Sequence, residues 1–203
     1  MDGAMARQQG KSSRAGAVLD SSFGSAPSAT KSRDLAKLFH ALNTHLQSLD
    51  IDYVLTYGTL LGWHRDGQPL PHDTDLDLAA PVAAFETIWA SRSRLPAGFT
   101  MHDTSHRHLG PKLYVEYRGR EADIYFLREE ENGQLRTLEA SSNPGDLLPY
   151  PHEWFFSPQP TVFLGESTFV PAQSLAYLEH IYHYLGPDAE LDPVTRYYRP
   201  RQR

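Results

Sequence analysis

The stretch YGTLLGWHRDGQPLPHDTDLDLAAP, residues Tyr57–Pro81, sets three aspartates at alternate positions: Asp73, Asp75 and Asp77. In a β-strand, residues i, i+2 and i+4 lie on one face, so this spacing predicts that the three carboxylates lie together. Aspartate is depleted in strands, and like charges this close repel one another. The pattern therefore indicates that a positively charged group binds among the carboxylates.

A divalent cation is the positive group that these oxygen ligands favour. Mg²⁺, or Mn²⁺, suits a site that contributes a few carboxylates and leaves positions for substrate phosphates and water. Surface aspartates that protect an edge strand from aggregation are the alternative. A calcium-binding EF-hand also opens with Asp-x-Asp-x-Asp, but Leu78 stands where that motif requires Gly and Ala84 where it requires Glu.

The segment before the aspartates predicts a phosphate site. Residues 52–57, DYVLTY, are typical of a buried strand, and Gly58 and Thr59 end it and open a short helix. A glycine at this corner lets a phosphate approach the backbone, and a helix N-terminus presents free N–H groups to an anion. Thr59 is either a further hydroxyl ligand or a plain helix N-cap. His64 and Arg65 are candidate phosphate contacts, or solvated charges.

A fourth carboxylate, Asp123, lies within the apolar stretch EADIYFL. A carboxylate inside such a strand is costly unless it is paired or bound to metal, so Asp123 is predicted to complete the metal site with Asp75 and Asp77 and to accept a proton from an attacking hydroxyl. Lys112, in the neighbouring predicted strand, is a candidate contact for donor phosphate. The alternative places Asp123 at a sheet edge, paired with Arg118 or Arg120.

The rest of the chain predicts one α/β (α+β) domain with a mixed β-sheet flanked by helices, over residues 31–203. Residues 1–30 are rich in Ser, Ala and Gly and predict a disordered tail. The periodicity predicts helices from Ser32 to Leu49, over 82–92 and over 172–186, and strands over 73–81, 111–119 and 121–129. In the last helix, the apolar side is expected to comprise Leu175, Leu178, Ile181, Tyr182 and Leu185.

The amino-acid composition excludes several kinds of partner and of functional site. The chain has 203 residues, 40% of them hydrophobic, which is enough for one core, and its net charge of −6 argues against nucleic acid as a partner. The absence of Cys excludes disulfides, thiolate nucleophiles and Cys-based zinc sites, and fits a cytoplasmic location. No apolar run reaches the roughly 18 residues of a transmembrane segment.

A histidine cluster suggests a different class of enzyme. His102, His106 and His108 lie within seven residues and would suit a zinc hydrolase. Their spacing matches no established zinc motif, so a His-rich surface loop is the favoured interpretation.

Taken together, the motif resembles the signature of the LicD family, which includes bacterial phosphocholine transferases and fukutin-related proteins, within the nucleotidyltransferase superfamily. The resemblance spans roughly Leu35 to Asp192, and ADIYFL is similar to a later strand of the family that carries the third carboxylate. This chain departs from the pattern at Tyr57, His72 and Thr74. The positions that match the signature are Gly58, Thr59, Leu60, Leu61, Gly62, Arg65, Pro71, Asp73, Asp75 and Asp77.

The resemblance implies a metal-dependent phosphotransferase. In such an enzyme Asp75 and Asp77 hold Mg²⁺ (or Mn²⁺), Asp73 and Asp123 complete or orient the cluster, and the metal neutralises phosphates of a nucleotide-activated donor such as a CDP-alcohol. A hydroxyl of a glycan or another acceptor then attacks in line. Nucleotidyl transfer from an NTP and a degenerate, non-catalytic binding module are the alternatives, because the motif alone does not distinguish them.

Overall fold

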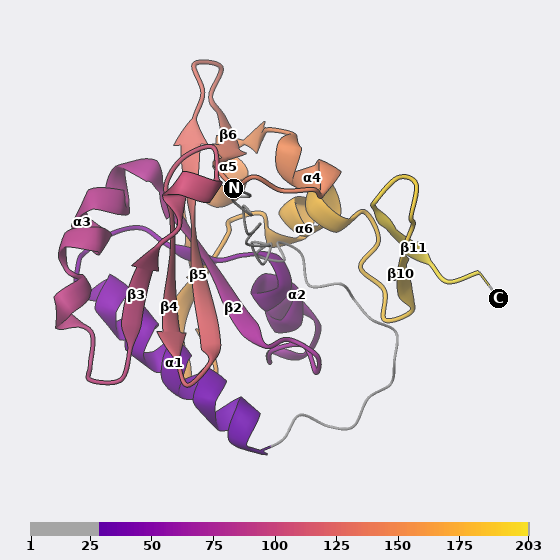
Figure 1. Ribbon diagram of the computed structural model, residues 1–203. Coiled ribbons are helices and arrows are strands. Elements are labelled where there is room, and N and C mark those ends of the chain that lie inside the picture. Colours follow the sequence, from indigo (N-terminus) through magenta and orange to yellow (C-terminus); the bar gives the residue numbers. More distant parts are fainter. Residues whose placement is uncertain (1–28, 203) are drawn as a thin grey trace, which may run out of the picture.

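A seven-stranded mixed sheet forms the centre of the structure, a computed structural model that describes residues 29–202 (Figure 1). Five strands follow the order β1-β2-β5-β4-β3, and β6 and β7 extend the sheet from β5. Only β2 and β5 pair in parallel within this sheet. The strands are β1 (Val54–Leu55), β2 (Asp75–Pro81), β3 (Thr100–Asp103), β4 (Lys112–Tyr117), β5 (Arg120–Glu129), β6 (Gln134–Thr137) and β7 (Tyr150–Pro151). The predicted α/β architecture is confirmed.

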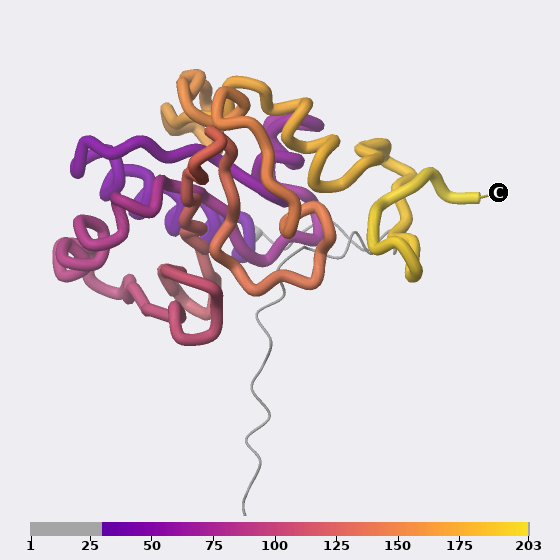
Figure 2. Tube along the Cα trace, turned by 90° about the horizontal axis from the view of Figure 1, so that it is seen from above, coloured from indigo at the N-terminus to yellow at the C-terminus, as the bar shows by residue number. Residues whose placement is uncertain are grey.

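Helices cover this sheet, and two separate hairpins complete the fold. The long helix α1 (Ala29–Gln47) crosses one face of the sheet, and the C-terminal hairpin projects from the side of the molecule (Figures 1 and 2). The other helices are α2 (Tyr57–Asp66), α3 (Phe85–Ala90), α4 (Pro144–Leu147), α5 (His152–Phe155) and α6 (Ser174–Tyr182), with 3₁₀ turns η1 (Val82–Ala84), η2 (Arg92–Arg94) and η3 (Ser105–Arg107). The hairpins pair β8 (Gln159–Phe163) with β9 (Glu166–Val170), and β10 (Ala189–Leu191) with β11 (Tyr198–Pro200).

The alternation of side chains along β2 and β5 divides the sheet into an apolar and a polar face. Leu76, Leu78 and Ile124 are fully buried in the core that α1 covers. Asp75 and Asp77 point from the opposite face, as the period of two residues in a strand requires. The same packing that buries the leucines therefore presents the carboxylates on the other side.

Two strands differ from the prediction. The second strand begins at Asp75 instead of Asp73, because the Asp73 N–H donates to the Leu70 carbonyl in a turn, 3.0 Å away. The first strand contains only Val54–Leu55, shorter than the predicted range 52–57. β3 lies in a segment that lacks apolar alternation, and the sequence did not predict it.

The last helix is shorter than predicted. It ends at Tyr182 because His183, with φ of 66° and ψ of −58°, leaves the helical path in a tight turn, in which the Tyr184 N–H donates to the Tyr182 carbonyl at 2.9 Å. Leu175 is 49% exposed, so its assignment to the apolar side is wrong, whereas Tyr177 is buried. Inward-facing tyrosines thus take part of the role expected of aliphatic residues.

The predicted tail at residues 1–30 lies almost wholly outside the described residues, which begin with α1 at Ala29. Between residues 29 and 202, no helix combines the length and the apolar character needed to cross a bilayer.

The two glycines of α2 have different surroundings and predict different mutant stabilities. A Cβ on Gly62 would lie 2.5 Å from the Gln68 carbonyl oxygen, whereas a Cβ on Gly58 would come no closer than 3.4 Å to its neighbours. We expect Gly62→Ala to lower the free energy of unfolding by about 1–3 kcal/mol, as overpacking does. Gly58→Ala is expected to stay within about 1 kcal/mol of wild type, since alanine favours helix. Urea unfolding of both variants checks this, and equal stabilities would contradict it.

Candidate active site

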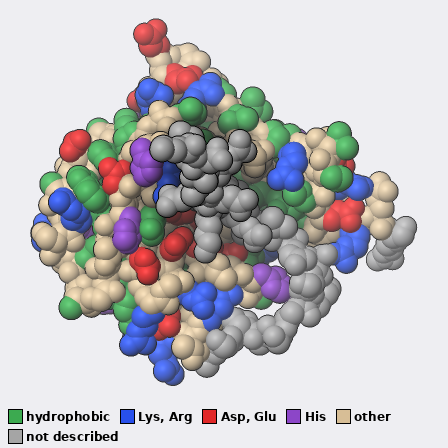
Figure 3. Space-filling model, in the orientation of Figure 1, with side chains coloured by type: hydrophobic (Ala, Val, Ile, Leu, Met, Phe, Trp, Pro, Cys, Tyr) green, Lys and Arg blue, Asp and Glu red, His purple; other side chains and the backbone are tan. Residues whose placement is uncertain are grey.

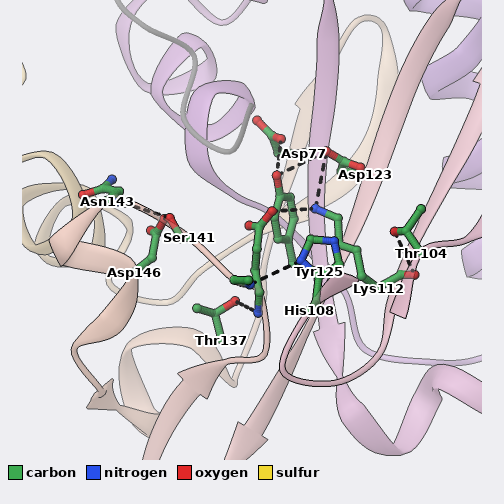
Figure 4. Close-up of polar contacts among 12 residues, drawn as sticks. Asp77, Thr104, His108, Lys112, Asp123, Tyr125, Thr137, Ser141, Asn143 and Asp146 are labelled. Carbon is green, nitrogen blue, oxygen red and sulfur yellow. Dashed lines mark hydrogen bonds and ion pairs between the residues drawn. The ribbon is translucent and has the colours of Figure 1, made fainter. Parts of the chain in front are cut away.

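The parallel pairing of β2 and β5 brings two predicted carboxylates side by side. Asp77 lies opposite Asp123 in the register, and Asp75 lies opposite Glu121. The Tyr125 hydroxyl is 3.3 Å from Asp77 Oδ1 and 3.2 Å from Asp123 Oδ2, so its single hydrogen serves both (Figure 4). The structure therefore confirms that Asp75, Asp77 and Asp123 share one face.

Asp73 reaches the same place from the turn before β2. A Cβ built on Gly58 would be 3.4 Å from both Asp73 Oδ2 and Asp77 Oδ2, so these two carboxylates flank the start of α2. Burial, with a contribution from Asp75, raises the pKa of Asp73 to about 7. All four predicted aspartates thus converge, although Asp73 arrives through a turn and not along the strand.

The electrostatics of this cluster favour a cation. Burial raises the pKa of Asp75, and repulsion from Asp123 adds to the effect. Burial raises the pKa of Asp77 well above its usual range, and the neighbouring carboxylates Asp75, Asp123 and Asp73 raise it further. Desolvated carboxylates that repel one another are the donor set that a hard divalent cation neutralises. By this chemistry, the residues fit Mg²⁺ or Mn²⁺.

The carboxylates do not, however, enclose a ready-made coordination shell. Over residues 29–202, no three His, Asp or Glu side chains are grouped as they would be around a metal ion. The Tyr125 hydroxyl lies between Asp77 and Asp123, and a lysine is paired with Asp123. Acidic and histidine side chains lie close to one another on the face drawn in Figure 3.

The corner between β1 and α2 holds the cluster in place. Tyr57, the first residue of α2, has φ of 44°, a conformation rare for a residue other than glycine. Thr56, and not Thr59, occupies the N-cap position, so the N-cap alternative for Thr59 is wrong. Thr59 is buried within the first turn, and its Oγ1 accepts a hydrogen bond from the Asp77 backbone N–H at 2.8 Å. The hydroxyl thus fixes the strand position that carries Asp77.

Lys112 lies in the site, but its partners are carboxylates. Its Nζ is 3.4 Å from Asp123 Oδ2 and 3.4 Å from Glu139 Oε1.

The alternative for Asp123, an edge position paired with Arg118 or Arg120, is wrong, because β5 lies between β2 and β4. Arg118 instead pairs with Asp34 at 3.7 Å.

The two other predicted phosphate contacts, Arg65 and His64, lie on α2. The Arg65 guanidinium donates to the carbonyl oxygens of Leu185 and Gly186, at 2.7–3.1 Å, and so anchors the chain after α6. His64 is exposed on α2, about 1.7 turns beyond Gly58, and therefore on a different side of the helix from the carboxylates. Among the described residues neither side chain is hydrogen-bonded to the carboxylates, although the Arg65 charge opposes the burial that raises the pKa of Asp73.

The three histidines do not form a zinc site. His102 lies 3.7 Å from Glu116 and stacks on Tyr114, and His106 contacts Arg107. His108 Nδ1 accepts from the Ala140 N–H. With the three rings directed to different partners, the zinc-hydrolase alternative has no support in the described part of the chain.

Two residues of the site were missed in the sequence. Tyr125 follows Asp123 by two positions, so strand alternation would have placed it on the same face. Glu139, which is 3% exposed, follows β6 and has no sequence signal, because only the tertiary fold brings it to Lys112. Burial raises the pKa of Glu139 to about 7, although Lys112 opposes the shift.

A small pocket adjoins the cluster. It has a volume of about 140 Å³, and Lys31, Gln68 and Asp73 are among the residues that line it. A larger pocket of about 300 Å³, between Gln47, Tyr53 and Phe169, includes none of the predicted site residues. The geometry of the carboxylates, and not pocket size, therefore identifies the site.

The described geometry is an acidic cluster on a mixed sheet, set against the first turn of a helix that carries Gly58. The model of the LicD/FKTN/FKRP family, nucleotidyltransferase domain, matches residues 50–173, and the chain belongs to this family. Membership makes the protein a nucleotide-related transferase. No curated protein matches the chain significantly.

Solved structures of low sequence identity also match. The lincosamide antibiotic adenylyltransferase LnuA, bound to lincomycin, is 12% identical over 78% of this chain and 90% of its own, with a TM-score of 0.45. ANT(2")-Ia in complex with adenylyl-2"-tobramycin is 13% identical over 68% of each chain, with a TM-score of 0.46.

The hydrogen bond between Thr59 and Asp77 predicts a difference between two substitutions. Thr59→Val leaves the buried Asp77 N–H without its acceptor and is expected to lower the free energy of unfolding by about 1–3 kcal/mol. Thr59→Ser keeps the hydroxyl and is expected to lose less than half as much. Urea unfolding at neutral pH measures both. Because valine keeps the methyl group and lacks only the hydroxyl, a loss in Thr59→Val no larger than that in Thr59→Ser would contradict the role of the hydrogen bond.

The buried carboxylate of Asp146 predicts a dependence of stability on pH. Ser141 Oγ donates to Asp146 Oδ2, and burial raises the pKa of Asp146 to about 6 from 3.8. Because the folded protein holds this proton more tightly than the unfolded chain, the carboxyl lowers stability as pH rises from about 4 to about 6. Asp146→Asn is expected to be more stable than wild type at pH 8, by up to about 3 kcal/mol, and similar at pH 4.

Urea unfolding from pH 4 to pH 8 checks this expectation. The quantity of interest is the difference between the two proteins, since Glu139 contributes to the pH dependence of both. A difference that does not change with pH would contradict it.

Proposed function

We propose that this protein transfers a phospho-alcohol group, such as phosphocholine or a polyol phosphate, from a nucleotide-activated donor to an acceptor hydroxyl. The donor is a CDP-alcohol or a similar compound, and the acceptor is a glycan or another hydroxyl-bearing molecule. The observation that carries the proposal is the alignment of Asp77 with Asp123 beside Gly58 at the start of α2. The acidic side chains therefore lie next to a helix N-terminus whose free N–H groups could bind phosphate.

The start of α2 supports binding of the donor phosphates. Gly58 has no side chain between the helix backbone and the carboxylates of Asp73 and Asp77, so a phosphate has room to approach N–H groups that lack helical partners. Thr59 Oγ1 accepts from the Asp77 N–H and keeps its own hydrogen available to donate.

Asp75 and Asp77 would hold Mg²⁺, or Mn²⁺, with Asp73 and Asp123 beside them to complete or orient the cluster. The cation would neutralise phosphate charge and so relieve the repulsion between donor and carboxylates.

The transfer reaction makes one P–O bond and breaks another, and a side chain of the site takes up the proton that is released. The oxygen of the acceptor hydroxyl forms a new P–O bond, the P–O bond to the nucleoside monophosphate breaks, and that monophosphate leaves. Asp123, whose Oδ2 lies 3.4 Å from the Lys112 ammonium, accepts the hydroxyl proton. The products are a phosphodiester on the acceptor and a free nucleotide such as CMP.

Nucleotidyl transfer uses the same cluster and is the alternative chemistry. There the hydroxyl attacks the α-phosphorus of an NTP and pyrophosphate leaves. A non-catalytic binding module is a third class, and the complete set of Asp75, Asp77 and Asp123 argues against it, since loss of metal ligands is the expected mark of degeneracy.

Thermal unfolding with CDP-alcohols and NTPs, each with and without Mg²⁺, tests the proposal. A ligand at about 100 times its Kd adds roughly 2.7 kcal/mol to the free energy of unfolding, and we expect this for a CDP-alcohol with Mg²⁺. Asp75→Asn with Asp77→Asn is expected to abolish the shift. Asp50→Asn with Asp52→Asn, which removes the same charge from exposed positions, should retain it.

Each other outcome decides between the alternatives. A metal-dependent shift with an NTP alone would favour nucleotidyl transfer. The absence of any shift would contradict the proposal and favour the binding module. A shift followed by release of CMP when an acceptor glycan is added would establish the phosphotransfer itself.

A further inference from the structure

The Lys112 ammonium is held on three sides in the interior of the site. Besides Asp123 and Glu139, each 3.4 Å from Nζ, the Tyr125 ring lies beneath it, with Nζ 3.2 Å from the ring centroid. The side chain is 2% exposed, so these groups surround the charge in place of water. A lysine is almost never buried to this extent unless it is paired.

The position of Lys112 is set by the pairing of the main chain. β4 begins at Lys112, opposite Tyr125, and β6 ends at Thr137, opposite Leu127. β4 and β6 both pair with β5 on the side opposite β2, so the residues that follow β6 lie next to Lys112. A hydrogen bond from the Leu138 N–H to the Phe126 carbonyl, at 3.2 Å, continues this pairing to the residue before Glu139.

Glu139 balances the ammonium from outside the aspartate cluster. Its carboxylate is as buried as Lys112, and removal of Lys112 would leave the Glu139 charge uncompensated in the interior. The pair, together with the ring of Tyr125, therefore keeps the ammonium next to Asp123 and resists its displacement.

We propose that Lys112 takes the place of a second divalent cation at Asp123, so that the site binds one divalent cation, at Asp75 and Asp77. This inference rests on the proposed function and adds the number of metal ions and the residue that limits it. A cation bound to Asp123 would have to approach an ammonium already held there, and the two positive charges would repel. Glu139 acts as a positioning residue, since its charge holds Lys112 in place.

This arrangement gives the site one positive charge that does not depend on the concentration of metal ions. A fixed ammonium is already oriented before substrate binds, so it stabilises negative charge without reorganisation. A single divalent cation then completes the neutralisation of the remaining aspartates.

Binding of Mn²⁺ alone, at pH 8 and followed by the paramagnetic resonance signal of free Mn²⁺, tests the inference without any substrate. We expect wild type to bind one ion per chain. The double variant Lys112→Met with Glu139→Gln removes one charge of each sign and frees Asp123, so it is expected to bind two. Arg136→Met with Glu130→Gln removes a different ion pair, 2.7 Å long, from the same sheet and should still bind one.

The outcomes separate this inference from the proposed function. Two ions in wild type, or one in the Lys112 and Glu139 double variant, would overturn the inference and leave a metal-dependent transferase in place. No ion in wild type would contradict the metal dependence and with it both proposals. Lys112→Gln, which keeps a donor for both carboxylates, is the second variant should the first fail to fold, and it is also expected to bind two.

Discussion

The repulsion between carboxylates on neighbouring strands is the constraint around which this structure is organised. The parallel register of β2 and β5 sets Asp77 beside Asp123, and burial makes the charge of Asp77 costly. Protonation, a hydrogen bond, a fixed cation or a bound metal ion can each reduce this electrostatic cost. The surroundings of the cluster hold the second and third of these in Tyr125 and Lys112.

The free-energy cost of the buried carboxylates is offset by the apolar side chains on the opposite face of the same strands. Leu76, Leu78 and Ile124 are fully buried in the core, and a shift of the register by one residue would exchange them with the aspartates. The hydrophobic core therefore enforces the position of the carboxylates. Thr59 reinforces it from α2 through its bond to the Asp77 backbone.

The family to which the chain belongs and the geometry of the site point to the same chemistry from separate observations. The family match covers residues 50–173, and it contains the aspartates, the glycine corner, Lys112 and Glu139. Within that span, the carboxylates form the site proposed for a cation and a phosphate, while Arg65 supports the chain after α6. Residues of one signature thus divide between the site and its scaffold.

Local spacing was enough to predict that Asp75 and Asp77 face one way, because alternation along a strand is a property of the backbone alone. Asp123 was expected to join them because a carboxylate in an apolar strand needs a partner, but the parallel register of β2 and β5 is what sets it beside Asp77. The mixed α/β class followed from the same periodicities. Asp73 joined the cluster through a turn, and Glu139 met Lys112 only because β4 and β6 pair with successive parts of β5. Contacts of this kind depend on which distant segments pair, and on the core that selects the pairing, so they arise only in the folded chain.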